Sequence, residues 1–310
     1  MSFENVGLVS ELLRAVEDLG FENMMPVQAE ALPLLLENEC DLIALAQTGT
    51  GKTAAFGLPL IQKIDLNDQN IEGLVICPTR ELCIQIANDL KKYSKYLSRC
   101  SVVPVYGGAS IEMQIRELKK GCKIVVATPG RMNDLIGRGK VDISYVKYVV
   151  LDEADEMLNM GFKEDLDAIL DCTPSQRHTW LFSATMPREV EEIANNYQKE
   201  PQRIQIGSRN QGSDNVRHFY YLVHAKDRYL ALKRIADYYP DIYAIIFCRT
   251  KVETQEVADM LIRDGYNADS LHGDLSQAQR DHVMSRFRLR NIQMLVATDV
   301  AARGLDVSNL

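Results

Sequence analysis

The sequence predicts an α/β protein made of two doubly wound, parallel-sheet domains in tandem. Short β-branched segments alternate along the chain with segments of helical periodicity. The strand-like segments are continuously apolar, which is typical of parallel strands covered by helices on both faces. The chain has 310 residues, more than the roughly 250 to 300 that one hydrophobic core usually serves.

The first predicted domain spans residues 1–206. Between its strands lie amphipathic segments such as residues 81–96, where Leu82, Ile86, Leu90 and Tyr93 recur on one helix face. In this class of fold, ligands bind beyond the carboxyl ends of the strands. The strands of this domain are predicted at residues 41–46, 73–77, 102–105, 124–127, 148–151, 179–182 and 203–206.

A polar, glycine-bearing segment without periodicity, residues 207–215, is predicted to be the linker. The second predicted domain, residues 216–310, repeats the strand and helix alternation. Its strands are predicted at residues 219–224, 243–248, 268–272 and 293–298.

Composition excludes several classes of protein. With 46% hydrophobic and 25% charged residues the chain can bury proper cores, and no apolar run approaches the roughly 18 residues of a membrane span. The first 25 residues lack a basic start followed by an apolar block, so no secretory signal is expected and the protein is expected in the cytoplasm. The seven cysteines contain no CxxC pair and are expected to be reduced packing residues.

The net charge of -8 argues against a broad positive field for nucleic acid. Residues 211–310 hold 13 basic and 13 acidic residues, so the acidic excess lies in residues 1–210. Any polyanion is therefore expected to be held by a few placed arginines, helix N-termini and backbone amides.

The strongest chemical signal is a glycine-rich segment between an apolar strand and a helix, the setting of a phosphate-binding loop for ATP. Its glycines let backbone N–H groups close around phosphate oxygens, its lysine pairs with the β and γ phosphates, and its last threonine helps to hold Mg²⁺. The first position carries alanine where the usual pattern has glycine. A merely structural turn is the alternative. The segment is Ala46-Gln47-Thr48-Gly49-Thr50-Gly51-Lys52-Thr53.

A second signal follows another strand of the same domain, where Val149-Val150-Leu151 runs into Asp152-Glu153-Ala154-Asp155. Asp152 is predicted to orient Mg²⁺ through its water shell, and Glu153 to align or deprotonate the attacking water. The alternative is an ordinary solvated helix start.

Together these residues resemble the DEAD-box family of ATP-dependent RNA helicases, as a bacterial-type core, over essentially the whole chain. The resemblance implies two RecA-like domains. It also implies that Phe21 and Gln28, within Gly20-Phe21-Glu22 and Pro26-Val27-Gln28, read adenine, because an amide suits its N6/N7 edge and a ring can stack on it. Met24 departs from the family's proline. A core phenylalanine and a solvated glutamine are the alternative.

The resemblance also implies RNA-backbone contacts and a coupling segment. Ser183 and Thr185, within Ser183-Ala184-Thr185, would link the acidic residues to domain closure; capping of the next helix is the alternative. In the second domain, Arg249 and Thr298 would face RNA, and Gly304 and Asp306 would face the nucleotide. Ordinary capped turns remain the alternative for each first-domain RNA candidate. These candidates are Pro78, Thr79, Arg80, Gly107, Gly108, Thr128 and Arg131.

The implied function is ATP-dependent remodelling of short RNA duplexes, with ATP and Mg²⁺ as cofactors and with RNA and ribonucleoprotein components as partners. Family members continue beyond this point to arginines that reach the γ phosphate. The second domain is therefore expected to be incomplete and the chain weakly active. An ATP-gated RNA clamp, a DNA helicase and a small-molecule kinase remain alternatives, and the RNA target and oligomeric state stay open.

Overall fold

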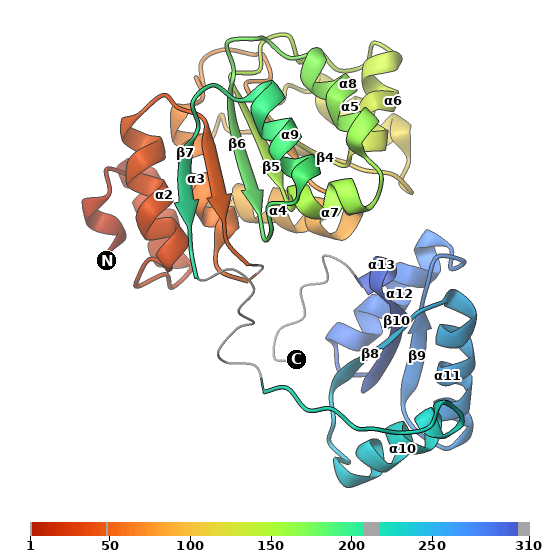
Figure 1. Cartoon of the computed structure of the whole chain (residues 1–310). Coiled ribbons are helices and arrows are strands. Elements are labelled where there is room, and N and C mark those ends of the chain that lie inside the picture. The colour runs from red at the N-terminus through yellow and green to blue at the C-terminus, as the bar shows by residue number, and fades with distance from the viewer. Residues whose placement is uncertain (1, 48, 208–216, 303–310) are drawn as a thin grey trace. The chain divides into compact units, whose positions relative to one another are not determined.

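A computed structural model describes residues 2–47, 49–207 and 217–302. The chain divides into two compact units, Met1–Gln211 and Gly212–Leu310. Figure 1 shows their elements. The first unit contains η1 (Phe3–Asn5), α1 (Ser10–Asp18), α2 (Pro26–Glu37), β1 (Leu42–Leu45), α3 (Lys52–Lys63), β2 (Gly73–Ile76), α4 (Arg80–Tyr93), β3 (Val102–Val105), α5 (Ile111–Lys119), β4 (Ile124–Ala127), α6 (Pro129–Gly137), β5 (Tyr148–Asp152), α7 (Ala154–Asn159), α8 (Lys163–Asp171), β6 (His178–Ser183), α9 (Arg188–Tyr197) and β7 (Gln202–Gln205). The second contains η2 (Ala225–Asp227), α10 (Arg228–Tyr238), β8 (Ala244–Cys248), α11 (Lys251–Arg263), β9 (Ala268–Leu271), α12 (Gln277–Arg288), β10 (Met294–Thr298) and α13 (Asp299–Ala302).

The first unit is built on a seven-stranded sheet in the order β3-β4-β2-β5-β6-β1-β7. Every pairing is parallel, so all the carboxyl ends lie at one edge. The register places Leu45 of β1 beside Ser183 of β6, and Asp152 of β5 beside Phe182. Helices cover both faces of this sheet (Figure 1), which confirms the predicted doubly wound class.

In the six strands other than the edge strand β7, alternate side chains enter two separate cores. On β5, Tyr148 and Val150 pack with α1 to α4, whereas Val149 and Leu151 pack with α5 to α9. This alternation follows from the two-residue period of a strand. It also explains why these strands are apolar throughout, because neither face meets water.

The second unit has a three-stranded parallel sheet in the order β8-β10-β9. One core joins β9 and β10 to α12 around Phe287, and the other joins the sheet to α10 and α11 around Leu261. The unit repeats the α/β architecture of the first on a smaller scale, as predicted.

Ten of the predicted strands are present, each within two residues of the predicted bounds. The helix predicted at residues 81–96 corresponds to α4, which begins at Arg80 and ends at Tyr93. The strand predicted at residues 219–224 is wrong, because this segment pairs with no described strand. Its β-branched and aromatic residues suit a sheet, but a strand also needs a partner for its backbone hydrogen bonds. The side chains of Phe219 to Val223 are 43% to 98% exposed. Of the predicted linker, only Gly207 lies within the described residues.

Among the described helices, none is both long enough and apolar enough to cross a membrane. All seven cysteines are free thiols, and Cys77 and Cys248 are buried. This agrees with their predicted packing role.

Candidate functional site

The strand order divides the carboxyl edge of the first sheet into two halves. The nucleotide candidates follow β1, β5 and β6, which are neighbours on one side. The first-domain RNA candidates follow β3, β4 and β2, which are neighbours on the other. Segments distant in sequence therefore form two adjacent candidate sites where this fold class binds ligands.

The phosphate loop joins β1 to α3 through backbone conformations that favour glycine. Gly49 and Gly51 have φ of 77° and 84°, in the left-handed region. A Cβ on Gly51 would lie 2.4 Å from Nε2 of Gln28, so this position also excludes a side chain sterically. Within the loop, the Thr50 hydroxyl donates to the carbonyl of Gln47 at 2.6 Å, whereas Thr48 lies outside the described residues.

Alanine at the start of the loop is compatible with its geometry. The methyl group of Ala46 is buried in the core shared with α2 and α3, and its N–H donates to the carbonyl of Ser183 at 2.9 Å. Ala46 thus continues the pairing of β1 with β6, and its methyl group points into the core rather than into the loop.

Lys52, the first residue of α3, is 6% exposed, and its Nζ lies 3.8 Å from Oδ1 of Asp152. No described residue forms a hydrogen bond with this buried Nζ. A buried ammonium without hydrogen-bond partners is costly, and phosphate oxygens would supply them at a helix N-terminus. The residues present therefore fit a nucleoside triphosphate.

The carboxylates of Asp152 and Glu153 lie at the end of β5, where both interact electrostatically with Lys52. Burial raises the pKa of Asp152, and the charge of Lys52 opposes that rise. Burial, followed by the neighbouring carboxylate of Asp152, raises the pKa of Glu153 to about 7. Glu153 also has φ of 53°, which is uncommon outside glycine and holds it at the turn before α7.

A hydrogen-bonded chain leads from these acids to the end of β6. The N–H of Asp155 donates to Oγ of Ser183 at 3.3 Å. Oδ2 of Asp155 accepts from the N–H and the hydroxyl of Thr185 at 2.9 and 2.7 Å. The structure thus brings Ser183 and Thr185 to the acidic turn.

Asp155 was not among the predicted site residues. Its position three residues after Asp152 was visible in the sequence, but its partners on β6 are visible only once β5 and β6 are paired.

Gln28 is buried in α2 and connects this helix to the phosphate loop. Its Oε1 accepts from the N–H of Met25 at 2.9 Å, and its Nε2 donates to the carbonyl of Gly51 at 3.0 Å. One N–H and one lone pair remain for a ligand. The 37%-exposed ring of Phe21 lies 6.2 Å from Phe3 and 6.4 Å from Tyr93, measured between ring centroids.

Thr53 and Asp152 are the candidate groups for a metal ion. Within the described residues, no group of three or more His, Cys, Asp or Glu side chains could hold a metal alone. Mg²⁺ is usually held by one or two protein groups together with substrate phosphates and water. The residues present fit that mode.

On the other half of the edge, helix N-termini follow three adjacent strands. Thr79 follows β2, after Pro78, and caps α4 by accepting from the N–H of Leu82 at 3.2 Å. The guanidinium of Arg80 lies 4.9 Å from the ring centroid of Tyr106. Thr128 precedes α6 and forms no side-chain cap, so its hydroxyl is not used for capping.

Arg131 connects two of these turns. Its Nη1 and Nη2 each donate to the carbonyl of Ala109 at 3.2 Å, and Nη1 donates to Oε1 of Gln114 at 2.9 Å. These bonds hold the turn of Gly107 and Gly108, where an added Cβ on Gly107 would meet nothing within 4 Å. The arrangement favours a positioning role for Arg131 beside any phosphate contact.

The second unit supplies two described candidates. Arg249 follows β8, and its N–H donates to Oε2 of Glu253 at 3.2 Å. Thr298 ends β10 and accepts from the N–H of Ala301 at 3.3 Å. Gly304 and Asp306 lie outside the described residues.

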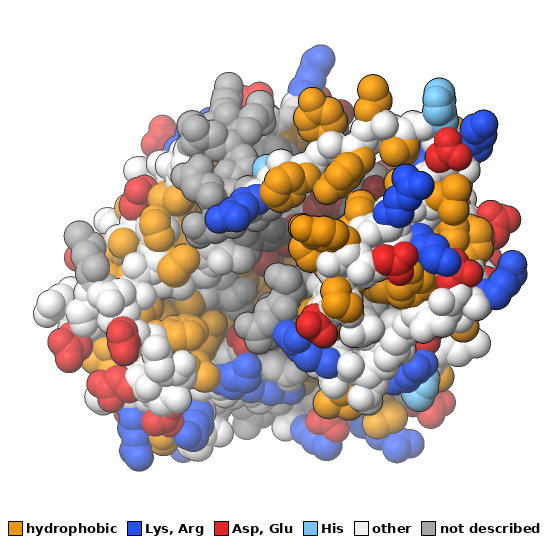
Figure 2. Space-filling model, turned by 90° about the horizontal axis from the view of Figure 1, so that it is seen from below, with side chains coloured by type: hydrophobic (Ala, Val, Ile, Leu, Met, Phe, Trp, Pro, Cys, Tyr) orange, Lys and Arg blue, Asp and Glu red, His pale blue; other side chains and the backbone are white. Residues whose placement is uncertain are grey.

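Charge is mixed on the face of the molecule that Figure 2 draws. In Figure 2, basic and acidic side chains are interspersed and no single sign dominates. Placed groups, rather than a broad field, therefore remain the basis for any contact with RNA.

A parallel sheet with a phosphate loop after β1 and carboxylates after β5, the second strand along from β1 with β6 between them, is the arrangement of RecA-like ATP-binding proteins. The first unit is of this class. The model of the DEAD/DEAH box helicase family matches residues 25–193, and that of the helicase conserved C-terminal domain matches residues 228–310. The chain belongs to the DEAD/DEAH box helicase family.

Relatives and solved structures agree with this assignment. The DEAD-box ATP-dependent RNA helicase CshA of Geobacillus kaustophilus is 47% identical over 309 residues, covering 100% of this chain and 66% of that relative. A DEAD box protein of Methanococcus jannaschii has 40% identity and a TM-score of 0.63, covering 100% of this chain and 83% of that one. S. cerevisiae Dbp5 bound to RNA and ADP BeF3 has 28% identity and a TM-score of 0.89, covering 99% and 78%.

Proposed function

We propose that this chain is the ATP-driven core of an RNA helicase that remodels or unwinds short RNA duplexes. The proposal rests on family membership and on the names of the similar proteins, which include an ATP-dependent RNA helicase and a protein bound to RNA. The chain spans about two thirds of the length of that helicase.

The observation that carries the proposal is the buried Lys52 ammonium, which has no hydrogen-bond partner among the described residues and lies beside the carboxylate of Asp152. In this mechanism Lys52 and the amides of the loop bind the β and γ phosphates, while Gln28 and Phe21 bind adenine. Mg²⁺, held by Thr53 and Asp152, would supply positive charge to the phosphates. Glu153, with its pKa of about 7, can accept a proton from the attacking water near neutral pH.

Binding of RNA is proposed for the turns after β2, β3 and β4 and for Arg249 and Thr298. Hydroxyl groups, helix N-termini and guanidinium groups can hold phosphates and 2'-hydroxyls without reading bases. The hydrogen bonds between Asp155 and Thr185 would report the state of the nucleotide site to the end of β6.

We propose that ATP and RNA together favour a closed state of the two domains, and that hydrolysis and release return the open one. Ribonucleoprotein components are the proposed partners and the cytoplasm is the proposed compartment.

The test is ATP turnover with and without single-stranded RNA. We compare the chain, its Glu153→Gln and Lys52→Ala variants, and a version extended beyond Leu310. RNA is expected to stimulate turnover. Glu153→Gln should abolish turnover but retain ATP-dependent RNA binding, whereas Lys52→Ala should lose both.

Three outcomes would contradict the proposal. Joint binding of ATP and RNA without turnover in any version would indicate a clamp. Equal stimulation by DNA of the same sequence would indicate a DNA helicase, since 2'-hydroxyl contacts would not matter. No effect of RNA on ATP affinity would favour a small-molecule kinase.

A further inference from the structure

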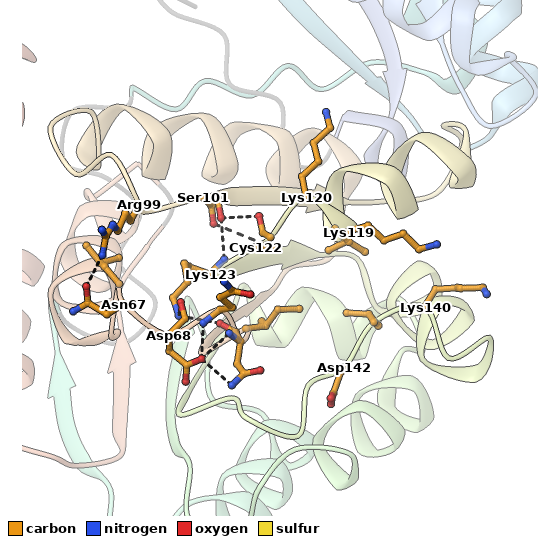
Figure 3. A pocket seen from close by; sticks show the side chains of 17 residues that line it. Asn67, Asp68, Arg99, Ser101, Lys119, Lys120, Cys122, Lys123, Lys140 and Asp142 are labelled. Atoms are coloured by element: carbon orange, nitrogen blue, oxygen red, sulfur yellow. Dashed lines mark hydrogen bonds between the residues drawn. The ribbon is translucent and has the colours of Figure 1, made fainter.

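A second concave site lies at the opposite edge of the first sheet. A pocket of 860 Å³ is lined by residues 66–71, 99, 101, 118–123 and 140–142, which include segments leading into β2, β3 and β4 (Figure 3). The RNA candidates follow the carboxyl ends of these same strands, roughly 13 Å away for a four-residue strand. The pocket is therefore separate from both candidate sites described above.

Basic side chains predominate in this pocket. Its lining contains Arg99, Lys119, Lys120, Lys123 and Lys140 and two acids, in a chain whose net charge is -8. Two of these lysines pair with acids outside the lining, Lys120 with Glu117 at 2.5 Å and Lys123 with Glu72 at 3.9 Å. Within the described part of the chain, Lys119 and Lys140 form no ion pair. Figure 3 shows both extending toward the same side of the pocket.

The two acids of the lining already accept hydrogen bonds from their own turns. Oδ1 of Asp68 accepts from the N–H and the side-chain amide of Asn70 at 3.0 and 2.8 Å. Oδ1 of Asp142 accepts from the N–H and hydroxyl of Ser144 at 2.9 and 2.7 Å. Both carboxylates keep their negative charge, but neither forms an ion pair with Lys119 or Lys140 among the described residues, so these two ammonium groups are available to an anion.

Side chains hold one wall of the pocket in place. Lys123 has a side chain only 4% exposed, and its Nζ donates to the carbonyls of Asp68 and Asn70 at 3.0 Å each. Arg99 donates to Oδ1 of Asn67 at 2.7 Å on the same loop. A loop fixed at both ends before binding loses little conformational entropy when a ligand arrives.

The other wall is tied to β3 and β4. Ser101 donates to the carbonyl of Gly121 at 2.9 Å and accepts from the N–H of Lys123 at 3.2 Å. These bonds place the backbone between Lys120 and Lys123 beside the start of β3. Hydrogen bonds thus join three of the four lining segments, residues 66–71, 99–101 and 118–123, and residues 140–142 form the fourth.

We propose that this pocket binds a phosphorylated small molecule of about nucleotide size. Its volume lies in the range of roughly 300 to 1,000 Å³ that is usual for small-molecule sites. Lysine ammonium groups bind phosphate as point charges, and the side chains of Asn67, Gln69 and Asn70 offer both donors and acceptors for the rest of the ligand.

Two other occupants fit less well. Single-stranded RNA binds on aromatic platforms, and this lining contains no aromatic residue. An extended acidic peptide commonly adds to a sheet edge, but the edge strand β3 contains Pro104, which has no N–H to donate.

The test is a calorimetric titration of the full chain. The chain is first saturated with a non-hydrolysable ATP analogue, and inorganic tripolyphosphate and GTP are then titrated into it in separate experiments. The double variant Lys119→Glu/Lys140→Glu should weaken this second binding at least about tenfold and leave RNA-stimulated ATP turnover unchanged. The exposed pair Lys91→Glu/Lys226→Glu changes net charge equally and should leave the second binding unchanged. Lys52→Ala should lose the ATP analogue and keep the second binding, which separates this proposal from the proposed function.

The proposal is overturned if neither phosphate compound binds the saturated chain at up to roughly 1 mM. It is also overturned if the control pair weakens binding equally, or if a glutamate-rich peptide or RNA binds the pocket more tightly. Should the double glutamate variant misfold, Lys119→Gln/Lys140→Gln provides the same test without new negative charge.

Discussion

Replacing Glu153 by glutamine should stabilise the first unit in the absence of nucleotide, and do so more at higher pH. In the folded chain the pKa of Glu153 is about 7, compared with its usual 4.5, because of burial and the carboxylate of Asp152. Folding therefore favours the protonated form. Ionisation of Glu153 therefore lowers the free energy of unfolding by nothing below pH 4.5 and by its full amount above pH 7. Glutamine does not ionise, so the variant lacks this loss of stability.

The size of the effect follows from the two pKa values. At 1.36 kcal/mol per pH unit, the ionised glutamate costs about 3 kcal/mol near pH 8 and about 1 kcal/mol near pH 5. The variant should gain those amounts in free energy of unfolding. A residue at a phosphate-binding centre is thus expected to oppose stability, as functional positions commonly do.

Urea unfolding monitored by tryptophan fluorescence measures this gain. Trp180 is the only tryptophan and is buried on β6, so its signal reports the first unit alone. The control is Glu30→Gln at an exposed position of α2, which should change stability by less than about 0.5 kcal/mol at either pH.

A gain for Glu153→Gln that is equal at both pH values would refute the reasoning, since a pH-independent effect cannot come from ionisation. A loss of stability near pH 8 would refute it as well.

Three further predictions concern other parts of the chain. Gly51→Ala should weaken ATP binding at least about tenfold, and by more than Gly49→Ala, which should cost only about 1 to 2 kcal/mol of backbone strain. The reason is that, of these two glycines, only Gly51 has a neighbour within 4 Å of an added Cβ. Equal effects of the two variants in nucleotide titrations would contradict this. Thr185→Val removes the 2.7 Å bond to Asp155 and should lower RNA-stimulated turnover about tenfold, with ATP affinity kept and Thr185→Ser restoring turnover; a parallel loss of ATP affinity would speak against coupling. Leu222→Ser should reduce concentration-dependent self-association in sedimentation velocity, since this side chain is 98% exposed within an apolar segment; a chain that stays monomeric at all concentrations would exclude this.

Much of the fold, and the residues proposed for the nucleotide site, could be predicted because their signals are local. Continuous apolar strands, helical periodicity and a glycine-rich turn before Lys52 each depend on neighbouring residues. The failure at residues 219–224 has the opposite cause. Their composition suits a strand, but strand formation depends on a partner that lies elsewhere in the chain.

The contacts that the predicted RNA residues make within the protein could not be read from their residue types. Arg131 has the chemistry of a phosphate ligand, yet its guanidinium is bonded to Ala109 and Gln114. Such bonds form between turns that follow different strands, so the sequence pattern alone does not show them.

The amino-acid sequence by itself determined the class of fold, the positions of ten strands and the residue types of the candidate phosphate loop, because backbone propensity and side-chain type act over a few residues. Only the tertiary structure decided which strand ends are neighbours. The sheet order places Asp152 beside Lys52, joins Asp155 to Thr185 and separates the candidate nucleotide residues from the candidate RNA residues along the edge. It also formed the basic pocket at the opposite edge from four segments that are separate in the sequence. The physical reason is that hydrogen bonds and ion pairs depend on distance in space, which is set by packing of the whole sheet.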